Sequence, residues 1–220
     1  MKITTVLQAF AVRFFVPSSP YGYVPEAIKS LKERYEFVGV PTTIEELIPP
    51  PNQGNLFRLG RFKYEGRDII VRELHLYHLG AQVSTSLSTA DSDLFLDDLM
   101  KWAEEEFKIT FTEFSSRTYS SQLEFELEKP LPDYFPKQQV VGRSISEYVS
   151  DFWPVKPPFE VSSVTFSYDP ATRVTGLGNF RIERRQGVEF GANLYFSEAP
   201  LTTESHTTLL QLFEDSLFQP

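Results

Sequence analysis

The two ends of this chain carry the same pattern of strands followed by a helix, once at residues 55–107 and again at 161–218. When the sequence is displaced by 111 residues, Gly80-Ala81-Gln82-Val83 aligns with Gly191-Ala192-Asn193-Leu194, and Leu99 aligns with Leu210 without a gap. Similarity at a fixed offset is typical of a repeated structural unit. The pattern therefore favours an internal duplication of a ββ(β)α unit.

Within the first unit, residues 56–64 and 68–77 are rich in β-branched and aromatic side chains, and Glu65-Gly66-Arg67 between them is typical of a hairpin turn. A third strand is expected at 81–88. A helix follows, because Phe95, Leu99, Trp102 and Phe107 recur at helical spacing, and Ala90-Asp91-Ser92-Asp93 offers side chains that cap its start. Since hairpins come in runs and helices follow them, we expect an α+β fold of mainly antiparallel sheet with helices on one face.

Proline density divides the chain into three segments. Residues 130–158 hold six prolines around a short predicted helix at 144–152, which is unfavourable for regular sheet. We interpret 1–129 as an N-terminal half, 130–158 as a Pro-rich connector and 159–220 as a C-terminal half. The three segments are also compatible with one continuous domain. Two short strands are expected at 108–114 and 120–128, before the connector.

Composition excludes several classes of function. The chain has no cysteine, which removes disulfides, thiolate metal sites and cysteine nucleophiles. No segment has the roughly 20 consecutive apolar residues of a membrane-spanning helix. A net charge of −9 disfavours non-specific binding to phosphate backbones. These features predict a soluble, cytoplasmic protein without a cofactor.

The weak candidates for catalysis lie in the second strand of the hairpin. His75 and His78 point to opposite faces of a strand, so they do not jointly bind one metal ion, whereas Glu73 and His75 share a face. Glu73, His75 and the neighbouring Arg72 are therefore the catalytic candidates, and no metal site is predicted. The acidic residues Asp91, Asp93, Asp97 and Asp98 are explained by helix capping and a solvated helix face.

Basic and aromatic residues are interleaved on the predicted strands, which is a pattern that nucleic-acid platforms use. The basic residues are Arg58, Arg61, Lys63, Arg67 and Arg72 in the first half, and Arg181, Arg184 and Arg185 in the second. Acidic residues between them dilute the charge, so nucleic acid is not the expected partner.

The leading hypothesis is a non-enzymatic protein-interaction or assembly subunit that binds a protein partner or a second copy of itself. Its expected contact residues lie in the connector, at Tyr134, Phe135, Phe152 and Trp153, because exposed aromatic side chains are effective interface anchors. The same aromatics are equally expected to close the core between the halves. A hydrolase-like enzyme with a polar site in a cleft is the alternative, and a nucleic-acid-binding platform is the third.

Overall fold

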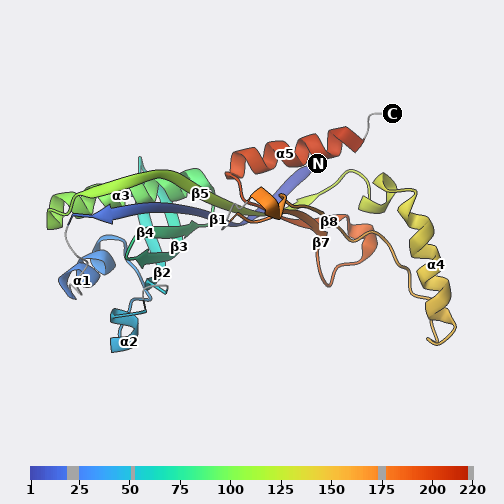
Figure 1. The fold of residues 1–220 in the computed structure, drawn as a ribbon, viewed down its shortest axis with the longest axis horizontal. Coiled ribbons are helices and arrows are strands. Elements are labelled where there is room, and N and C mark those ends of the chain that lie inside the picture. The colour runs from blue at the N-terminus through green and yellow to red at the C-terminus, as the bar shows by residue number, and fades with distance from the viewer. Residues whose placement is uncertain (19–24, 51–52, 173–176, 218–220) are drawn as a thin grey trace. The chain divides into compact units, whose positions relative to one another are not determined.

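The structure is a computed structural model that describes residues 1–18, 25–50, 53–172 and 177–217. It is an α+β protein with antiparallel strands, and the described residues form five α-helices. Figure 1 shows their arrangement along the chain. The chain divides into two compact units. The larger unit comprises Val6–Gln122 and Pro200–His206, and the smaller unit comprises Met1–Thr5, Leu123–Ala199 and Thr207–Pro220. Residues 218–220, at the end of the predicted C-terminal half, lie outside the described residues.

The larger unit is built on the predicted hairpin. Strands β2 (Asn55–Tyr64) and β3 (Arg67–Tyr77) pair antiparallel, with Phe57 opposite Leu74 and Phe62 opposite Ile69. The turn residues Glu65 and Gly66 both have positive φ, at 47° and 78°, as a tight hairpin turn requires. Strand β4 (Gly80–Thr85) pairs with β3 and with β1 (Lys2–Pro17), so the strand order in this unit is β2-β3-β4-β1-β5.

Helix α3 (Thr89–Phe107) covers one face of these strands (Figure 1). It begins earlier than the sequence predicted, because the Ser88 side chain accepts a hydrogen bond from the Asp91 N–H and acts as the N-cap. The predicted apolar stripe faces the core: Phe95 and Leu99 are buried. Helix α1 (Pro25–Arg34) and the segment after it add Leu31, Tyr35 and Phe37 to the same core.

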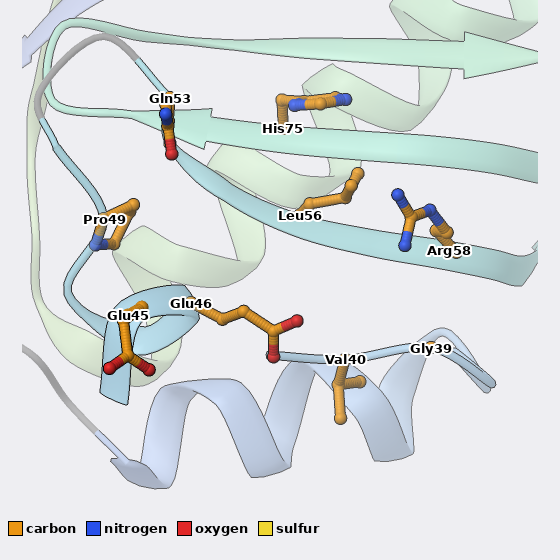
Figure 2. Close-up of a pocket in the computed structure, with 10 residues that line it drawn as sticks. Gly39, Val40, Glu45, Glu46, Pro49, Gln53, Leu56, Arg58 and His75 are labelled. Carbon is orange, nitrogen blue, oxygen red and sulfur yellow. The ribbon is translucent and has the colours of Figure 1, made fainter. Parts of the chain in front are cut away.

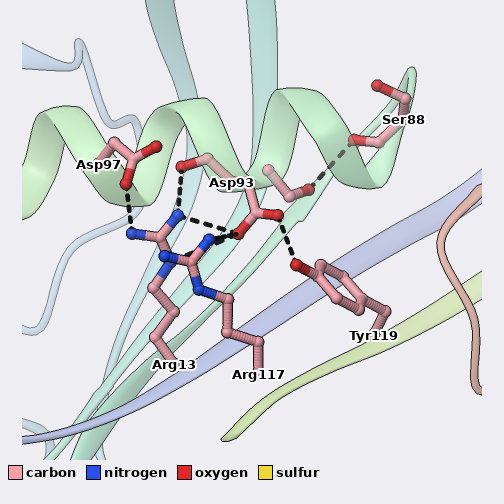
Figure 3. A network of polar contacts seen from close by, with 7 residues as sticks. Arg13, Ser88, Asp93, Asp97, Arg117 and Tyr119 are labelled. Carbon is pink, nitrogen blue, oxygen red and sulfur yellow. Dashed lines mark hydrogen bonds and ion pairs between the residues drawn. The ribbon is translucent and has the colours of Figure 1, made fainter. Parts of the chain in front are cut away.

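A buried arginine connects β1 to α3. Arg13 is 2% exposed, and its guanidinium bonds Asp93 at 2.9 Å and also Asp97, both on α3 (Figure 3). Asp93 also accepts a 2.7 Å hydrogen bond from the Tyr119 hydroxyl and lies 3.9 Å from the Arg117 guanidinium, both on β5 (Phe111–Glu126). This network therefore fixes three elements of the larger unit to one carboxylate.

The smaller unit has the strand order β5-β8-β7-β6. Strands β6 (Ser163–Phe166), β7 (Phe180–Arg184) and β8 (Leu194–Ala199) pair antiparallel in succession. Leu123, Phe125, Ile182 and Tyr195 are buried there. The connector between β5 and β6 carries the 3-10 turn η1 (Leu131–Tyr134) and helix α4 (Gln138–Ser150), and helix α5 (Thr203–Leu217) follows β8.

The order of elements repeats along the chain. The first half runs β1, α1 with the short helix α2 (Ile44–Leu47), β2, β3, β4 and α3; the second runs β5, α4, β6, β7, β8 and α5. The structural offset between the halves is 114 residues and not 111. It relates the first residues of β4 and β8, the first residues of α3 and α5, and the helix caps Ser88 and Thr202.

The difference of three residues has a local cause. In the first half, Gly80 and Ala81 are already part of β4, whereas Gly191 and Ala192 lie in the 3-10 turn η3 (Phe190–Ala192) before β8 begins. Thr89 and Thr203, which are 114 residues apart and begin α3 and α5, contact each other reciprocally. The N–H group of each donates to the hydroxyl of the other, at 3.1 and 2.9 Å. The two halves therefore begin their last helices in the same way.

Two sequence predictions are corrected. The strands expected at 108–114 and 120–128 are one strand, β5, which runs unbroken through Thr118 and Tyr119 because no residue in this stretch prevents pairing. The connector helix begins at Gln138, six residues before the predicted start, since Pro136 is the last proline before it and the next one comes at Pro154.

Candidate protein-interaction surface

Helix α4 contacts the rest of its own unit through its smallest residues. Gly142 and Ser146, one turn apart, are buried. The Ser146 hydroxyl accepts a 3.2 Å hydrogen bond from the Phe159 N–H, and a β-carbon added at Gly142 would lie 2.2 Å from the Phe159 carbonyl oxygen. The backbone after the helix therefore packs directly on this face of α4.

The large apolar side chains of α4 lie on a different face of the helix and are exposed. Val141, Ile145, Tyr148 and Phe152 follow one another at steps of four, three and four residues, so they form a single stripe on the helix and the turn that continues it. Their exposed fractions are 59%, 38%, 71% and 75%. We call these four residues the α4 stripe. Trp153, which follows Phe152 in the sequence, is 60% exposed.

Exposed large apolar side chains are concentrated in α4 and in the segment that follows it. Eight of the twenty-one exposed large apolar residues among the described residues lie between Val140 and Phe159. Single exposed apolar residues are ordinary, but a contiguous group marks an interaction surface. The α4 stripe with Trp153 is therefore the candidate site.

The four interface residues predicted from the sequence fall into two pairs. Phe152 and Trp153 are exposed, whereas Tyr134 and Phe135 are half-buried at the end of η1. Burial raises the pKa of Tyr134 above its ordinary value, which is consistent with a structural position. Sequence reasoning did not single out Val141, Ile145 and Tyr148, and the helix predicted at 144–152 left Val141 outside it.

Substituting Gly142 with alanine is expected to displace α4 and to lower the free energy of unfolding of the smaller unit by about 1–3 kcal/mol. The added methyl group has only backbone to meet, and backbone cannot rotate away as a side chain would. Urea unfolding followed by circular dichroism measures the change. Gly191 is the matched control, because an added β-carbon there has nothing within 4 Å. Gly187 is unsuitable, because its φ of 75° would strain any other residue. Gly191→Ala is therefore expected to leave stability nearly unchanged, and an equal loss for both variants would contradict the packing argument.

Of the three catalytic candidates, His75 lines a pocket of about 330 Å³ in the larger unit (Figure 2). The pocket is bounded by α2, the edge of β2 and the end of β3, and its polar lining includes Glu46, Arg58 and His75. Glu73 lies 3.6 Å from His75 Nε2 and 3.5 Å from Arg58 Nε. Arg58, which the sequence did not suggest for catalysis, thus pairs with Glu73, whereas Arg72 is not among the residues that line the pocket.

The chemistry of this pocket is limited by its lining. Glu46 accepts hydrogen bonds from the N–H groups of Thr42 and Thr43 at the start of α2, and these bonds lower its pKa. The described residues that line it include the imidazole of His75 and the carboxylates of Glu45 and Glu46, but no serine, threonine, cysteine or tyrosine that could act as a nucleophile. The pocket therefore offers less to a hydrolase reaction than the sequence alternative requires.

Each of the four aspartates of α3, Asp91, Asp93, Asp97 and Asp98, has an arginine partner within the larger unit. Asp93 and Asp97 bind Arg13, Asp91 lies 3.6 Å from Arg67, and Asp98 accepts bonds from the Arg34 guanidinium and the Tyr35 hydroxyl. Burial, followed by the charge of Asp98, raises the pKa of Tyr35 far above its ordinary value. Among the described residues, no three or more His, Asp or Glu side chains are grouped as metal ligands.

Most of the basic residues considered for nucleic-acid binding are also paired. Carboxylates lie within 4 Å of six arginines, which are Arg58, Arg61, Arg67, Arg181, Arg184 and Arg185. Such pairing offsets the positive potential that phosphate binding needs. Within the described part of the chain, no helix has the length and apolar character needed to cross a membrane.

No family model matches the sequence, and no curated protein matches it. Among solved structures, the chain is similar to Methanococcus jannaschii TBP, with 11% identity, a TM-score of 0.45 and coverage of 98% of this chain and 97% of that one. At this identity and score, the likeness gives no argument about function.

Proposed function

We propose that this protein is a non-enzymatic interaction or assembly subunit and that the α4 stripe with Trp153 is its contact surface. The observation that supports the proposal is the orientation of α4. The helix uses Gly142 and Ser146 to pack on its own chain, while its large apolar side chains face outward. A helix that served only the fold would bury its apolar stripe, because burial of such side chains stabilises a protein by about 1.5–3 kcal/mol each.

The composition of the stripe fits this role. Tyr and Trp are enriched in the centres of protein interfaces, and charged residues are depleted there. The α4 stripe contains no charged residue. An apolar surface of this kind recognises a partner by shape and burial of apolar area.

The proposal is tested by affinity capture with matched variants. Tyr148→Ser/Phe152→Ser removes the two most exposed residues of the stripe, and Phe166→Ser/Leu212→Ser removes two residues of similar exposure, 56% and 59%, elsewhere in the chain. A partner that the wild type and the control capture equally, and that the stripe variant loses at least about tenfold, supports the proposal. Equal recovery by all three proteins, or no stoichiometric partner including a second copy, contradicts it.

A further inference from the structure

We propose that the occupant of the α4 stripe is the same stripe of a second copy, packed antiparallel about a two-fold axis. This inference rests on the proposed function, since it uses the same surface, and it names the partner. An isologous contact of this kind closes the assembly at two copies and uses one self-complementary patch.

The spacing of the stripe is symmetric about its centre. In an antiparallel pair centred between Ser146 and Glu147, Val141 of one copy lies level with Phe152 of the other, and Ile145 lies level with Tyr148. The smaller side chain therefore meets the larger one in each layer, which is the condition for filling the space between helices at constant separation. In a parallel pair, Phe152 would face Phe152 at one end and Val141 would face Val141 at the other, so the separation would change along the helices.

The exposed area is sufficient for a weak dimer. An aromatic side chain offers about 150–250 Å², so the exposed fractions of Tyr148 and Phe152 give roughly 300 Å² in each copy, and Val141 with Ile145 adds roughly 150 Å². Two copies together would bury roughly 900 Å², which is below the standard size of a specific interface and in the range of weak, transient contacts. We therefore expect a dissociation constant in the range of about 1–50 μM.

Charge predicts how the dimer responds to salt. Each copy carries a net charge of −9, so two copies repel one another, whereas the stripe itself is uncharged. Salt screens this repulsion over distances above about 10 Å without weakening apolar contacts. The dimer is therefore expected to tighten several-fold between about 50 and 500 mM salt. A contact formed mainly by ion pairs would weaken over the same range.

The test uses two single variants of the full chain, Ile145→Lys and Tyr148→Glu, in sedimentation equilibrium at several concentrations. Each variant alone places a charge against an apolar side chain in both halves of a symmetric dimer, and we expect its dissociation constant to rise at least about thirtyfold. When the two variants are mixed, antiparallel packing places the introduced lysine of one chain opposite the introduced glutamate of the other and restores the native contact between Ile145 and Tyr148 on the other side. The mixture should then dimerise within about fivefold of the wild type.

Both positions are exposed, at 38% and 71%, so both variants are expected to fold, and circular dichroism checks this. A wild type that stays monomeric at about 200 μM overturns self-pairing, and so does a dimer that either single variant leaves intact. Failure to recover the dimer in the mixture overturns the antiparallel arrangement. In each of these cases the proposed interaction function still stands if the capture experiment recovers a different protein that the Tyr148→Ser/Phe152→Ser variant loses.

Discussion

Replacing Arg13 with methionine is expected to lower the free energy of unfolding of the larger unit by about 3 kcal/mol. Methionine retains the apolar length of the side chain, so the change removes mainly the charge and its hydrogen bonds. Asp93, with 22% of its side chain exposed, then loses its closest cation, and the backbone carbonyl of Asp93 loses a 3.1 Å bond from Arg13 Nη2. Breaking a buried ion pair from one side is costly because the remaining group stays poorly solvated.

The arginine is itself stabilised in its charged form. Burial acts to lower the pKa of Arg13, but the hydrogen bonds and charges of Asp97 and Asp93 offset this effect and raise the pKa above its ordinary value. The network therefore holds a fixed charge at the junction of β1, α3 and β5 (Figure 3). Asp97, at 60% exposure, is expected to contribute less to stability than Asp93, because water screens its charge.

Urea unfolding measures this effect when it is followed by the fluorescence of Trp102 in a Trp153→Phe background, which leaves one tryptophan in the larger unit. Arg34→Met is the matched control, because Arg34 pairs with Asp98 on the same helix but is 40% exposed, and its loss is expected to cost at most about 1 kcal/mol. Adding Asp93→Asn to Arg13→Met should recover part of the stability. If Arg13→Met and Arg34→Met lower the free energy of unfolding equally, burial of the Arg13 network does not add to its stabilising effect.

The elements of this fold were largely readable because their signals are local. The hairpin turn at Glu65-Gly66, the alternation of β2 and β3 and the apolar spacing of α3 act over a few residues, and the structure contains each of them. The sequence identities at an offset of 111 did not give the register of the duplication. The register depends on where each strand begins, and because η3 precedes β8, this strand begins three residues after Gly191.

The candidate surface shows a different limit of sequence reasoning. The aromatic residues Phe152 and Trp153 suggested an interface, but the sequence alone also allowed them to close a core. Their exposure is decided by another face of α4, where Gly142 and Ser146 permit close approach of the Phe159 backbone. Small residues carry a weak signal in a sequence, because the same residues also occur in exposed loops. The partner of Arg13 was equally unreadable, since it lies 80 residues away along the chain.

Lowering the pH is also expected to destabilise the folded protein strongly, through His206. The sequence did not distinguish this histidine from His75 and His78. His206, at the start of α5, is fully buried, and its Nδ1 lies 3.1 Å from the Ser121 hydroxyl of β5. Burial lowers the pKa of His206 from 6.5 to about 4, despite the opposing effect of Ser121. The folded protein therefore keeps this imidazole neutral at pH values where the unfolded chain binds a proton.

The direction of the pH dependence follows from this difference. Above pH 6.5 the side chain is neutral in both states and has no effect, whereas between pH 6.5 and about 4 only the unfolded state gains the proton, so stability falls as the pH falls. The expected loss between pH 7 and pH 5 is about 2 kcal/mol, at about 1.36 kcal/mol for each unit below 6.5. His206→Gln, which retains hydrogen-bonding groups without titrating, should flatten this part of the curve. Urea midpoints measured from pH 7 to pH 5 test the assignment, and a slope that persists in His206→Gln would place the acid sensitivity in another group.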